Sequence, residues 1–371
     1  MNEQRFQQEE WQYEDNAGKR RIDYDLIRIL ACASVLIFHF NASVCGFDTV
    51  GQLVYPNELI PSVYFGCVSL GDIGNNLFFM LSGAALMGSR KIASGKDLTH
   101  FYLNRAEKLM PPFYIAWLWA TCAQLLMNKT ISGAPIPSLL LTLFGMDGYG
   151  SARGWFTNNF YQVGEWYLGC AIICYLLWPL VMYLWDHLPA WVFLPLVALI
   201  YGITVFSTDG NLITVPVRLT QMIAGGCFAR YIKQMKNIPL IGTTVAVTIA
   251  VIMAQKYIHA VTVGSVVCWM IFLLISLLVA CFPAFFQAIS SAIISAAALT
   301  YPIFLVHHKL ISLMVKGFDL AHFTYRYVLV LFVIYFVLAV LIAKMLKRTT
   351  SAAMNVIKQR RASCSEQHSD G

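Results

Sequence analysis

The chain has 371 residues, of which 58% are hydrophobic and only 12% are charged, and its mean hydropathy is +0.63. This composition lies far outside the range of soluble proteins and excludes soluble binding modules and nucleic-acid-binding proteins. The formal charge of +7 therefore bears on how the chain is oriented in a lipid bilayer. The sequence predicts an all-α membrane protein, because a helix satisfies its own backbone groups where water is absent.

Apolar runs of about 18 to 25 residues predict a bundle of about ten transmembrane helices in a domain that covers residues 24–346. The expected limits, in chain order, are 24–44, 70–89, 109–128, 165–185, 190–207, 212–231, 238–255, 262–282, 290–315 and 325–346. The sixth is the weakest, since Arg218 and Gln221 interrupt it. Residues 1–23 are expected to form a polar N-terminal tail, and residues 347–371 a short basic and polar tail.

The distribution of cations predicts on which side of the membrane each loop lies. Lys and Arg are frequent in both tails and in the loops that follow the second and sixth expected spans. The opposite side holds only Lys129, Arg153, Lys256, Lys309, Lys316 and Arg326. Because cytoplasmic loops carry the excess of Lys and Arg, both termini are expected in the cytoplasm, which requires an even number of spans.

The first expected span carries three ionisable residues, Asp25, Arg28 and His39. Arg28 and His39 are eleven positions apart, so they share one helix face, roughly 16 Å from each other along the axis. Asp25 precedes Arg28 by three residues, within reach of an ion pair. Ionisable groups inside a membrane helix usually face a protein cavity and mark a functional site. The alternative is an Arg that extends to the interface and a His bonded to a neighbouring helix.

Two further segments contribute small and basic residues. The second expected span contains Ser82 and Gly83, a pair that typically lets helices approach closely. Arg105 and Lys108 lie just before Pro111, in the first turn of the third expected span, where proline is tolerated. These two cations either anchor the chain at the cytoplasmic interface or bind a phosphate-bearing ligand there.

The longest expected external loop, residues 129–164, is rich in Gly, Asn and aromatic residues and leads into Glu165 and Trp166. Some of its aromatic residues belong to the belt that is usual at a membrane interface. The mixture of aromatic rings and amide groups would also suit a sugar acceptor. Both interpretations stay open on this pattern alone.

The ninth expected span carries Tyr301 and the adjacent pair His307 and His308. A His pair near the end of a membrane helix could be structural, a proton relay or a fragment of a metal site. Cys170 and Cys174 share a helix face in the fourth expected span, but the sequence offers no further ligands beside them. We therefore expect no metal site.

Five motifs occur in order along the chain. They are D-x-x-R followed by an intramembrane His, as Asp25, Arg28 and His39; FF-x-x-SG, as Phe78 to Gly83; F-x-x-x-R-x-x-[R/K]-[L/I]-x-P, as Phe101 to Pro111; W-x-L followed by YLL-x-P, as Trp166 to Pro179; and SY-x-[I/L]-[Y/F]-L-x-H, as Thr300 to His307. In this set the chain resembles acyltransferase family 3, a family of integral membrane O-acyltransferases. The resemblance covers nearly the whole chain.

The chain departs from the family pattern at three positions. Lys108 stands where many members have a second Arg, which keeps the charge but loses the bidentate fork. Ala171 replaces a frequent Glu of the fourth span, so no role for that acid is carried over, and Thr300 replaces the usual Ser. No hydrolase-like domain follows the last expected span, so we expect the stand-alone form of the family.

The resemblance implies transfer of an acyl group, most often acetyl, from cytoplasmic acyl-CoA to a hydroxyl of a cell-surface or lipid-linked glycan, in the plasma (inner) membrane. Acyl-CoA is then the donor substrate, with no permanently bound cofactor, and the lipid bilayer and the glycan are the other partners. Arg28, Arg105 and Lys108 would bind the anionic nucleotide of CoA, His39 would be the general base, and Asp25 would orient Arg28. Further candidates for substrate contacts are Ser82, Glu165, Trp166, Tyr301 and His307.

A proton-coupled transporter or flippase for a glycan or a small metabolite is the alternative, because inward-facing His and Arg residues also serve such carriers. Carriers often consist of two related halves with interrupted helices, and the sequence has no such internal symmetry. A purely structural or sensory subunit would leave the pair Arg28 and His39 unexplained. The sequence therefore favours the acyltransferase.

Overall fold

The computed structural model describes residues 20–46, 54–55, 57–64, 67–88, 92–129, 134–208, 211, 213–231 and 238–369. Most of the expected N-terminal tail, up to residue 19, lies outside the described residues. The elements are α2 (Ile22–Cys45), β1 (Val63–Tyr64), β2 (Val68–Ser69), α3 (Leu70–Met87), α4 (Gly95–Asn128), η1 (Ile136–Ser138), α5 (Leu139–Leu143), α6 (Asp147–Ala152), α7 (Glu165–His187), α8 (Ala190–Ser207), α9 (Val215–Tyr231), α10 (Ile238–Met253), η2 (Gln255–Tyr257), α11 (Ala260–Cys281), α12 (Pro283–Ala288), α13 (Ser290–Ala297), α14 (Thr300–Met314), η3 (Leu320–His322) and α15 (Tyr325–Ser369).

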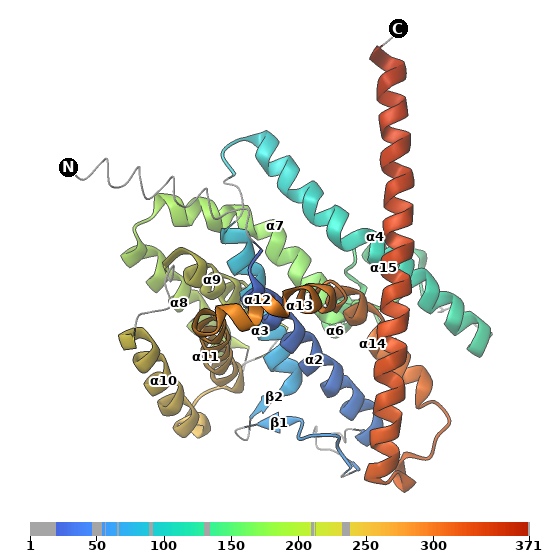
Figure 1. The fold of residues 1–371 in the computed structure, drawn as a ribbon, viewed down its shortest axis with the longest axis horizontal. Coiled ribbons are helices and arrows are strands. Elements are labelled where there is room, and N and C mark those ends of the chain that lie inside the picture. Colours follow the sequence, from blue (N-terminus) through green and yellow to red (C-terminus); the bar gives the residue numbers. More distant parts are fainter. Residues whose placement is uncertain are drawn as a thin grey trace.

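The described chain is almost entirely helical, which confirms the all-α prediction (Figure 1). Among the described residues, six helices are long and apolar enough to cross a membrane, namely α2, α4, α7, α8, α11 and α15. The bent pair α13 and α14 raises this number to seven if it forms one span. The chain is thus a multi-pass helical membrane protein. A count of ten spans and a cytoplasmic location of both termini stay predictions.

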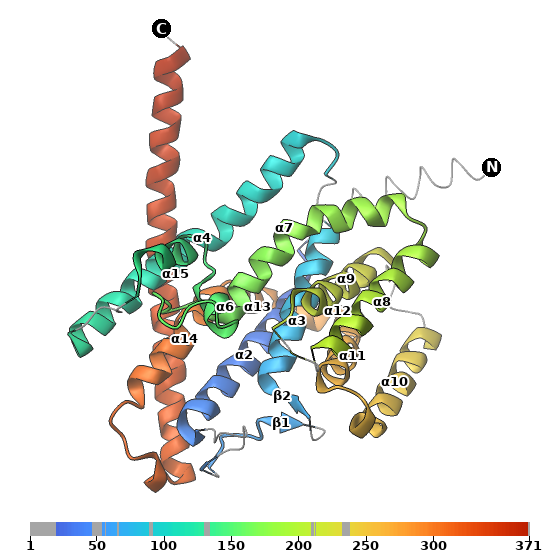
Figure 2. The same cartoon turned by 180° about the vertical axis from the view of Figure 1, so that it is seen from behind.

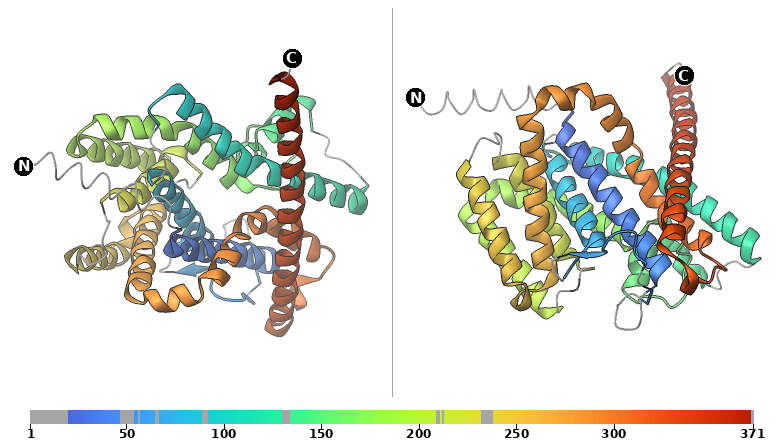
Figure 3. Two further views of the ribbon diagram at one scale, coloured as in Figure 1. Left: turned by 45° about the horizontal axis from the view of Figure 1, so that its top comes forward. Right: turned by 60° about the horizontal axis from the view of Figure 1, so that its bottom comes forward.

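Helix α2 lies in the middle of the bundle, between α3 on one side and the pair α13 and α14 on the other (Figures 1 and 3). Helix α3 also packs against α9 and α11, while α7 packs against α6 and α9 (Figure 2). Buried side chains such as Ile27, Leu77 and Phe272 join α2, α3 and α11 in one apolar cluster. Of the ionisable residues of α2, Asp25 is buried, whereas Arg28 and His39 are partly buried.

Two glycines allow α3 and α9 to touch at their backbones. A Cβ atom at Gly83 would lie 1.7 Å from the carbonyl oxygen of Met222, and one at Gly225 would lie 1.7 Å from that of Met80. The contact is reciprocal, so each helix presents a glycine to a carbonyl of the other. Close approach through small residues is the usual way in which membrane helices associate. The glycine of the FF-x-x-SG motif is therefore a packing residue, as the sequence predicted.

Helix α4 begins earlier than the sequence predicts. It begins at Gly95 because Ser94 caps it, accepting a hydrogen bond from the Asp97 N–H at 3.2 Å. Pro111 and Pro112 therefore lie inside a continuous helix of 34 residues, and the prediction that they occupy its first turn is wrong. As a result, Arg105 and Lys108 stand on a helix, three residues apart on one side of it.

Two further differences concern the end of the chain. The ninth expected span consists of two helices, α13 and α14, which meet at an angle of 49° around Ala298 and Leu299. Helix α15 continues through the residues expected to form a polar tail and ends at Ser369, so it projects far from the bundle (Figure 1). The high helix propensity of its Ala, Lys, Arg and Met residues accounts for this extension beyond the apolar part.

Candidate active site

A cavity of about 290 Å³ brings together the three cations expected to bind the donor. Arg28 enters it from α2, and Arg105 and Lys108 enter it from α4. No acidic side chain is among the described residues that line it. The remaining lining is mostly apolar and aromatic, with hydroxyls from Ser82 and Tyr301. We call this space the cationic cavity, and its charge favours an anionic ligand.

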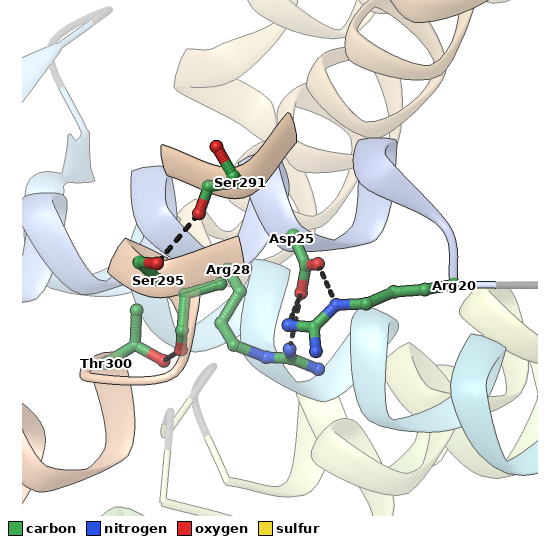
Figure 4. A network of polar contacts seen from close by, with 7 residues as sticks. Arg20, Asp25, Arg28, Ser291, Ser295 and Thr300 are labelled. Carbon is green, nitrogen blue, oxygen red and sulfur yellow. Dashed lines mark hydrogen bonds and ion pairs between the residues drawn. The ribbon is translucent and has the colours of Figure 1, made fainter. Parts of the chain in front are cut away.

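Asp25 fixes the position of Arg28, as the sequence predicted. The buried Asp25 carboxylate accepts a hydrogen bond from Arg28 Nη1 at 2.9 Å. It also accepts one from Arg20 Nε at 2.6 Å and one from Arg20 Nη2 at 3.2 Å, so it lies between two guanidinium groups (Figure 4). With two cations for one carboxylate, the cluster keeps a net positive charge at the cavity wall.

Ser82 and Tyr301 also line the cationic cavity. Ser82 Oγ lies 3.1 Å from the Tyr175 hydroxyl, and the Tyr301 hydroxyl donates to the carbonyl oxygen of Leu109 at 2.9 Å. These bonds hold α3 to α7 and α14 to α4 across the cavity. Both residues thus hold the walls of the cavity, and their predicted contacts with a substrate stay a prediction.

Three aromatic rings, Phe78, Tyr167 and Phe304, line the cationic cavity, and Tyr167 contacts the other two. The Tyr167 ring centroid lies 5.9 Å from that of Phe78 and 5.3 Å from that of Phe304. Phe304 in turn lies 5.8 Å from the ring of His307. We call these three rings the aromatic wall. His39 is not among the described residues that line the cavity, so the path from Arg28 to His39 stays a prediction, and the aromatic wall lies next to the histidine cluster through Phe304 and His307.

Behind the aromatic wall, three histidines form a cluster that joins α2 to α14. The ring of His39 stacks on that of His308, with centroids 4.6 Å apart and planes at 27°. The His307 ring meets His39 edge-on at 5.0 Å. In the described part of the chain, no protein group forms a hydrogen bond with His39. Its ring nitrogens are therefore available to a substrate hydroxyl.

Glu165 reaches the histidine cluster from α7. His308 Nδ1 donates a hydrogen bond to the Glu165 carboxylate. This bond fixes the orientation of the His308 ring. Glu165 itself has φ of +45°, in the left-handed region that costs a non-glycine residue free energy. Gly148 packs against its backbone, since a Cβ there would lie 2.2 Å from the Glu165 carbonyl oxygen. The fold thus holds Glu165 in a strained position that points it at His308.

His307 and Trp166 have other surroundings. His307 Nδ1 donates to the carbonyl oxygen of Phe304 at 2.7 Å, while its buried Nε2 has no protein partner among the described residues. Trp166 lies beneath Arg218, whose guanidinium carbon is 5.0 Å from the ring centroid. Of the two, His307 belongs to the histidine cluster, and Trp166 belongs to a separate polar network around Arg218.

The network around Arg218 is a feature that sequence reasoning missed. Arg218 is fully buried, and its Nη1 donates to Asn76 Oδ1 at 2.5 Å and to Gln221 Oε1 at 2.9 Å. Gln221 also donates to Asn76 and to Ser265, so the network joins α3, α9 and α11. The signal in the sequence was the interruption of the sixth expected span by Arg218 and Gln221. A buried arginine held by neutral amides stabilises one helix arrangement, because every other arrangement would leave the charge without partners.

Comparison with protein families agrees with the motifs. The model of the family described as Acyltransferase domain matches residues 21–347, which include all the residues of the cationic cavity and the histidine cluster. Neither the curated proteins nor the solved structures gave a match. The matched region covers far more than half of the chain and agrees with the five motifs in their order. The chain therefore belongs to acyltransferase family 3, a family of membrane acyltransferases.

Proposed function

We propose that the chain is a membrane O-acyltransferase that moves an acyl group, most often acetyl, from acyl-CoA to a hydroxyl of a cell-surface or lipid-linked glycan. The observation that carries this proposal is the convergence of Arg28, Arg105 and Lys108 on one cavity whose inner end lies against the histidine cluster. A cationic opening and a deeper imidazole suit a donor with a charged nucleotide at one end and a thioester at the other.

The phosphates of CoA would bind at the cationic opening. Arg28 and Arg105 offer planar guanidinium groups that form paired hydrogen bonds with phosphate, and Lys108 adds a point charge. The pantetheine arm would extend along the apolar and aromatic lining. To reach His39, the arm has to displace the aromatic wall, whose Phe78, Tyr167 and Phe304 are side chains able to rotate.

In the proposed reaction, His39 takes the proton of the acceptor hydroxyl while its oxygen forms a bond with the thioester carbonyl carbon. The carbon–sulfur bond then breaks, and the CoA thiolate leaves and takes up a proton. Neutral imidazole suits this role because its ordinary pKa lies near physiological pH. A transient acyl-His39 is a second route, in which the acyl group crosses before the acceptor arrives.

The acceptor would approach from the side opposite the cationic cavity. The residues before Glu165 expose the aromatic rings of Trp155 and Phe156. Aromatic faces beside amides are typical platforms for sugar rings, and this segment leads directly to the Glu165 carboxylate. The glycan would therefore meet the histidine cluster at the start of α7.

The donor part of the proposal is tested with purified protein, radiolabelled acetyl-CoA and a crude membrane glycolipid fraction. Arg105→Gln combined with Lys108→Gln is expected to raise KM for acetyl-CoA roughly 10- to 100-fold, as the loss of charge-assisted hydrogen bonds predicts. Lys96→Gln is the matched control, because Lys96 is exposed on the same helix and lies outside the described cavity lining. An unchanged KM in the double variant, or no turnover of acetyl-CoA by the wild type, would contradict the proposal.

Glu165 is expected to act through His308, so its loss changes turnover and leaves donor binding intact. Glu165→Gln removes the charge that fixes the ring of His308, and kcat is expected to fall about 10- to 100-fold with KM for acetyl-CoA unchanged. His308→Gln should show a similar loss, and the double variant should be no worse than the more affected single variant, because the two residues form one unit. Additive losses would show that they act separately.

A further inference from the structure

A second and larger cavity, of about 920 Å³, lies along α2 and shares Thr300 with the cationic cavity. Its walls come from α2, from the junction of α13 and α14, and from α15. The wall is apolar over most of its length, through residues such as Ile29, Leu36, Ile303 and Phe336. We call it the lateral groove. Helices α2 and α15, and the pair α13 and α14 taken together, are long and apolar enough to cross a membrane, so lipid is the expected surrounding of the groove.

The bend between α13 and α14 creates the lateral groove. Helix α15 packs against α14, whereas α13, which turns away at 49°, packs against α2. Ser291 and Ser295 on α13 lie beside α2 near this break (Figure 4). The hydroxyl of Ser295 donates to the carbonyl oxygen of Ser291 within the helix, so α13 presents an apolar surface with its polar atom satisfied. In the part of the chain that the structure describes, no side chain fills the space between α13 and α15.

One end of the lateral groove is strongly basic. Lys344, Lys347 and Arg348 line it from α15, followed by Ser351. These positions stand at i, i+3, i+4 and i+7, so the four side chains share one helix face. None of the described lining residues is acidic. An apolar channel that ends in three cations is complementary to a molecule with a hydrocarbon chain and an anionic head.

From this complementarity we propose that the lateral groove binds one anionic phospholipid. Its phosphate contacts Lys344, Lys347 and Arg348, and one acyl chain lies along the apolar wall formed by α2, α14 and α15. Juxtamembrane cations attract acidic lipids, and the burial of each methylene adds to binding. The lipid belongs to the leaflet on the basic side, which the distribution of cations predicts to be cytoplasmic.

The position of the groove couples the lipid to the cationic cavity. Thr300 lines both spaces, and its hydroxyl donates to the carbonyl oxygen of Ala297 at the α13–α14 break. The Cys32 thiol of α2 contacts the Thr300 carbonyl oxygen at 3.6 Å. A lipid in the groove would therefore support the bend from which Tyr301 and the histidine pair of α14 follow.

The test uses the full chain in nanodiscs made of equal parts phosphatidylglycerol and phosphatidylcholine, followed by extraction into mild detergent and mass spectrometry of the retained lipid. The wild type is expected to retain phosphatidylglycerol in preference to phosphatidylcholine. Lys344→Gln combined with Lys347→Gln should lower that retention about tenfold. The matched control, Lys96→Gln with Arg360→Gln, removes the same charge at exposed positions outside the described groove lining and should change nothing.

A second variant tests the contribution of the lipid's acyl chain separately from that of its head group. Ala33 is exposed in the lateral groove, so Ala33→Phe fills the channel and is expected to lower lipid retention while all cations remain. Equal retention of both lipids by the wild type would overturn the proposal. It would show that the groove holds lipid without preference, as the lipid shell around any membrane protein does. A phosphatidylglycerol with a diazirine on its acyl chain should label α2 and α15. Photo-crosslinking from position 336 to a second copy of the chain, with no lipid adduct, would show that another protomer fills the groove and would also overturn it.

Discussion

Replacing His39 with alanine is expected to lower kcat for acyl transfer by about 10²- to 10⁴-fold, the range that loss of a general base produces. His39 connects α2 to the histidine pair of α14, since its ring stacks on His308 and meets His307 edge-on. KM for acetyl-CoA should change little, because the cations of the cationic cavity are untouched. The measurement is initial rate against acetyl-CoA concentration in detergent or liposomes.

His322→Ala is the control for this experiment, because His322 is exposed on the short η3 helix, away from the histidine cluster. It should behave as the wild type. His39→Gln extends the test, since a side chain of similar length keeps part of the packing and supplies no base. If His39→Ala inserts normally and keeps full activity, His39 is not the base, and His308, oriented by Glu165, becomes the candidate in its place.

Replacing Gly83 with alanine is expected to destabilise the bundle by about 3 kcal/mol or more, at the upper end of what overpacking costs. The added Cβ would lie 1.7 Å from the Met222 carbonyl oxygen, and this atom belongs to a helix backbone that cannot rotate aside. Helices α3 and α9 would have to separate, and the Arg218 network that bridges them would lose its geometry. Thermal unfolding in detergent and the yield of folded protein measure the effect.

Gly202→Ala gives the matched control, because no atom lies within 4 Å of a Cβ at that position on α8. Its effect on stability should stay within about 0.5 kcal/mol. Gly225→Ala should reproduce the loss seen for Gly83→Ala, as the partner in the same contact. A Gly83→Ala protein as stable as the control would show that α3 and α9 do not approach this closely.

Local patterns in the sequence were sufficient to predict an all-helical membrane protein and the spacing of the cations within each helix. Arg28 and Asp25 are three residues apart on one helix, and so are Arg105 and Lys108, which means that helical geometry alone decides their relation. The distribution of cations further predicted that the intramembrane charge of α2 and the basic run before Pro111 lie on the same side of the membrane. The structure places all three cations on one cavity.

The contacts between distant helices were not predictable in the same way. Glu165 and His308 are 143 residues apart, and nothing in either segment shows that His308, rather than its neighbour His307, faces the carboxylate. The network around Arg218 draws its members from three helices, because Gln221 passes it on to Ser265 of α11. In the sequence the same residue looks like an interruption in a span. The sequence holds two signals for the start of α4, a capping residue at Ser94 and two prolines further along. The helix begins at the cap, and the prolines lie inside it.

The aromatic wall has a consequence for the leakage of protons across the membrane. A protein that opens a charged chamber toward one face of a membrane and a group of imidazoles toward the other would conduct protons if water joined the two. In the proposed site, Phe78 and Phe304 each lie against the Tyr167 ring and would fill that path with aromatic carbon. Apart from the Tyr167 hydroxyl, these rings offer water no hydrogen-bonding partner, so the wall would limit proton leakage while the site is empty.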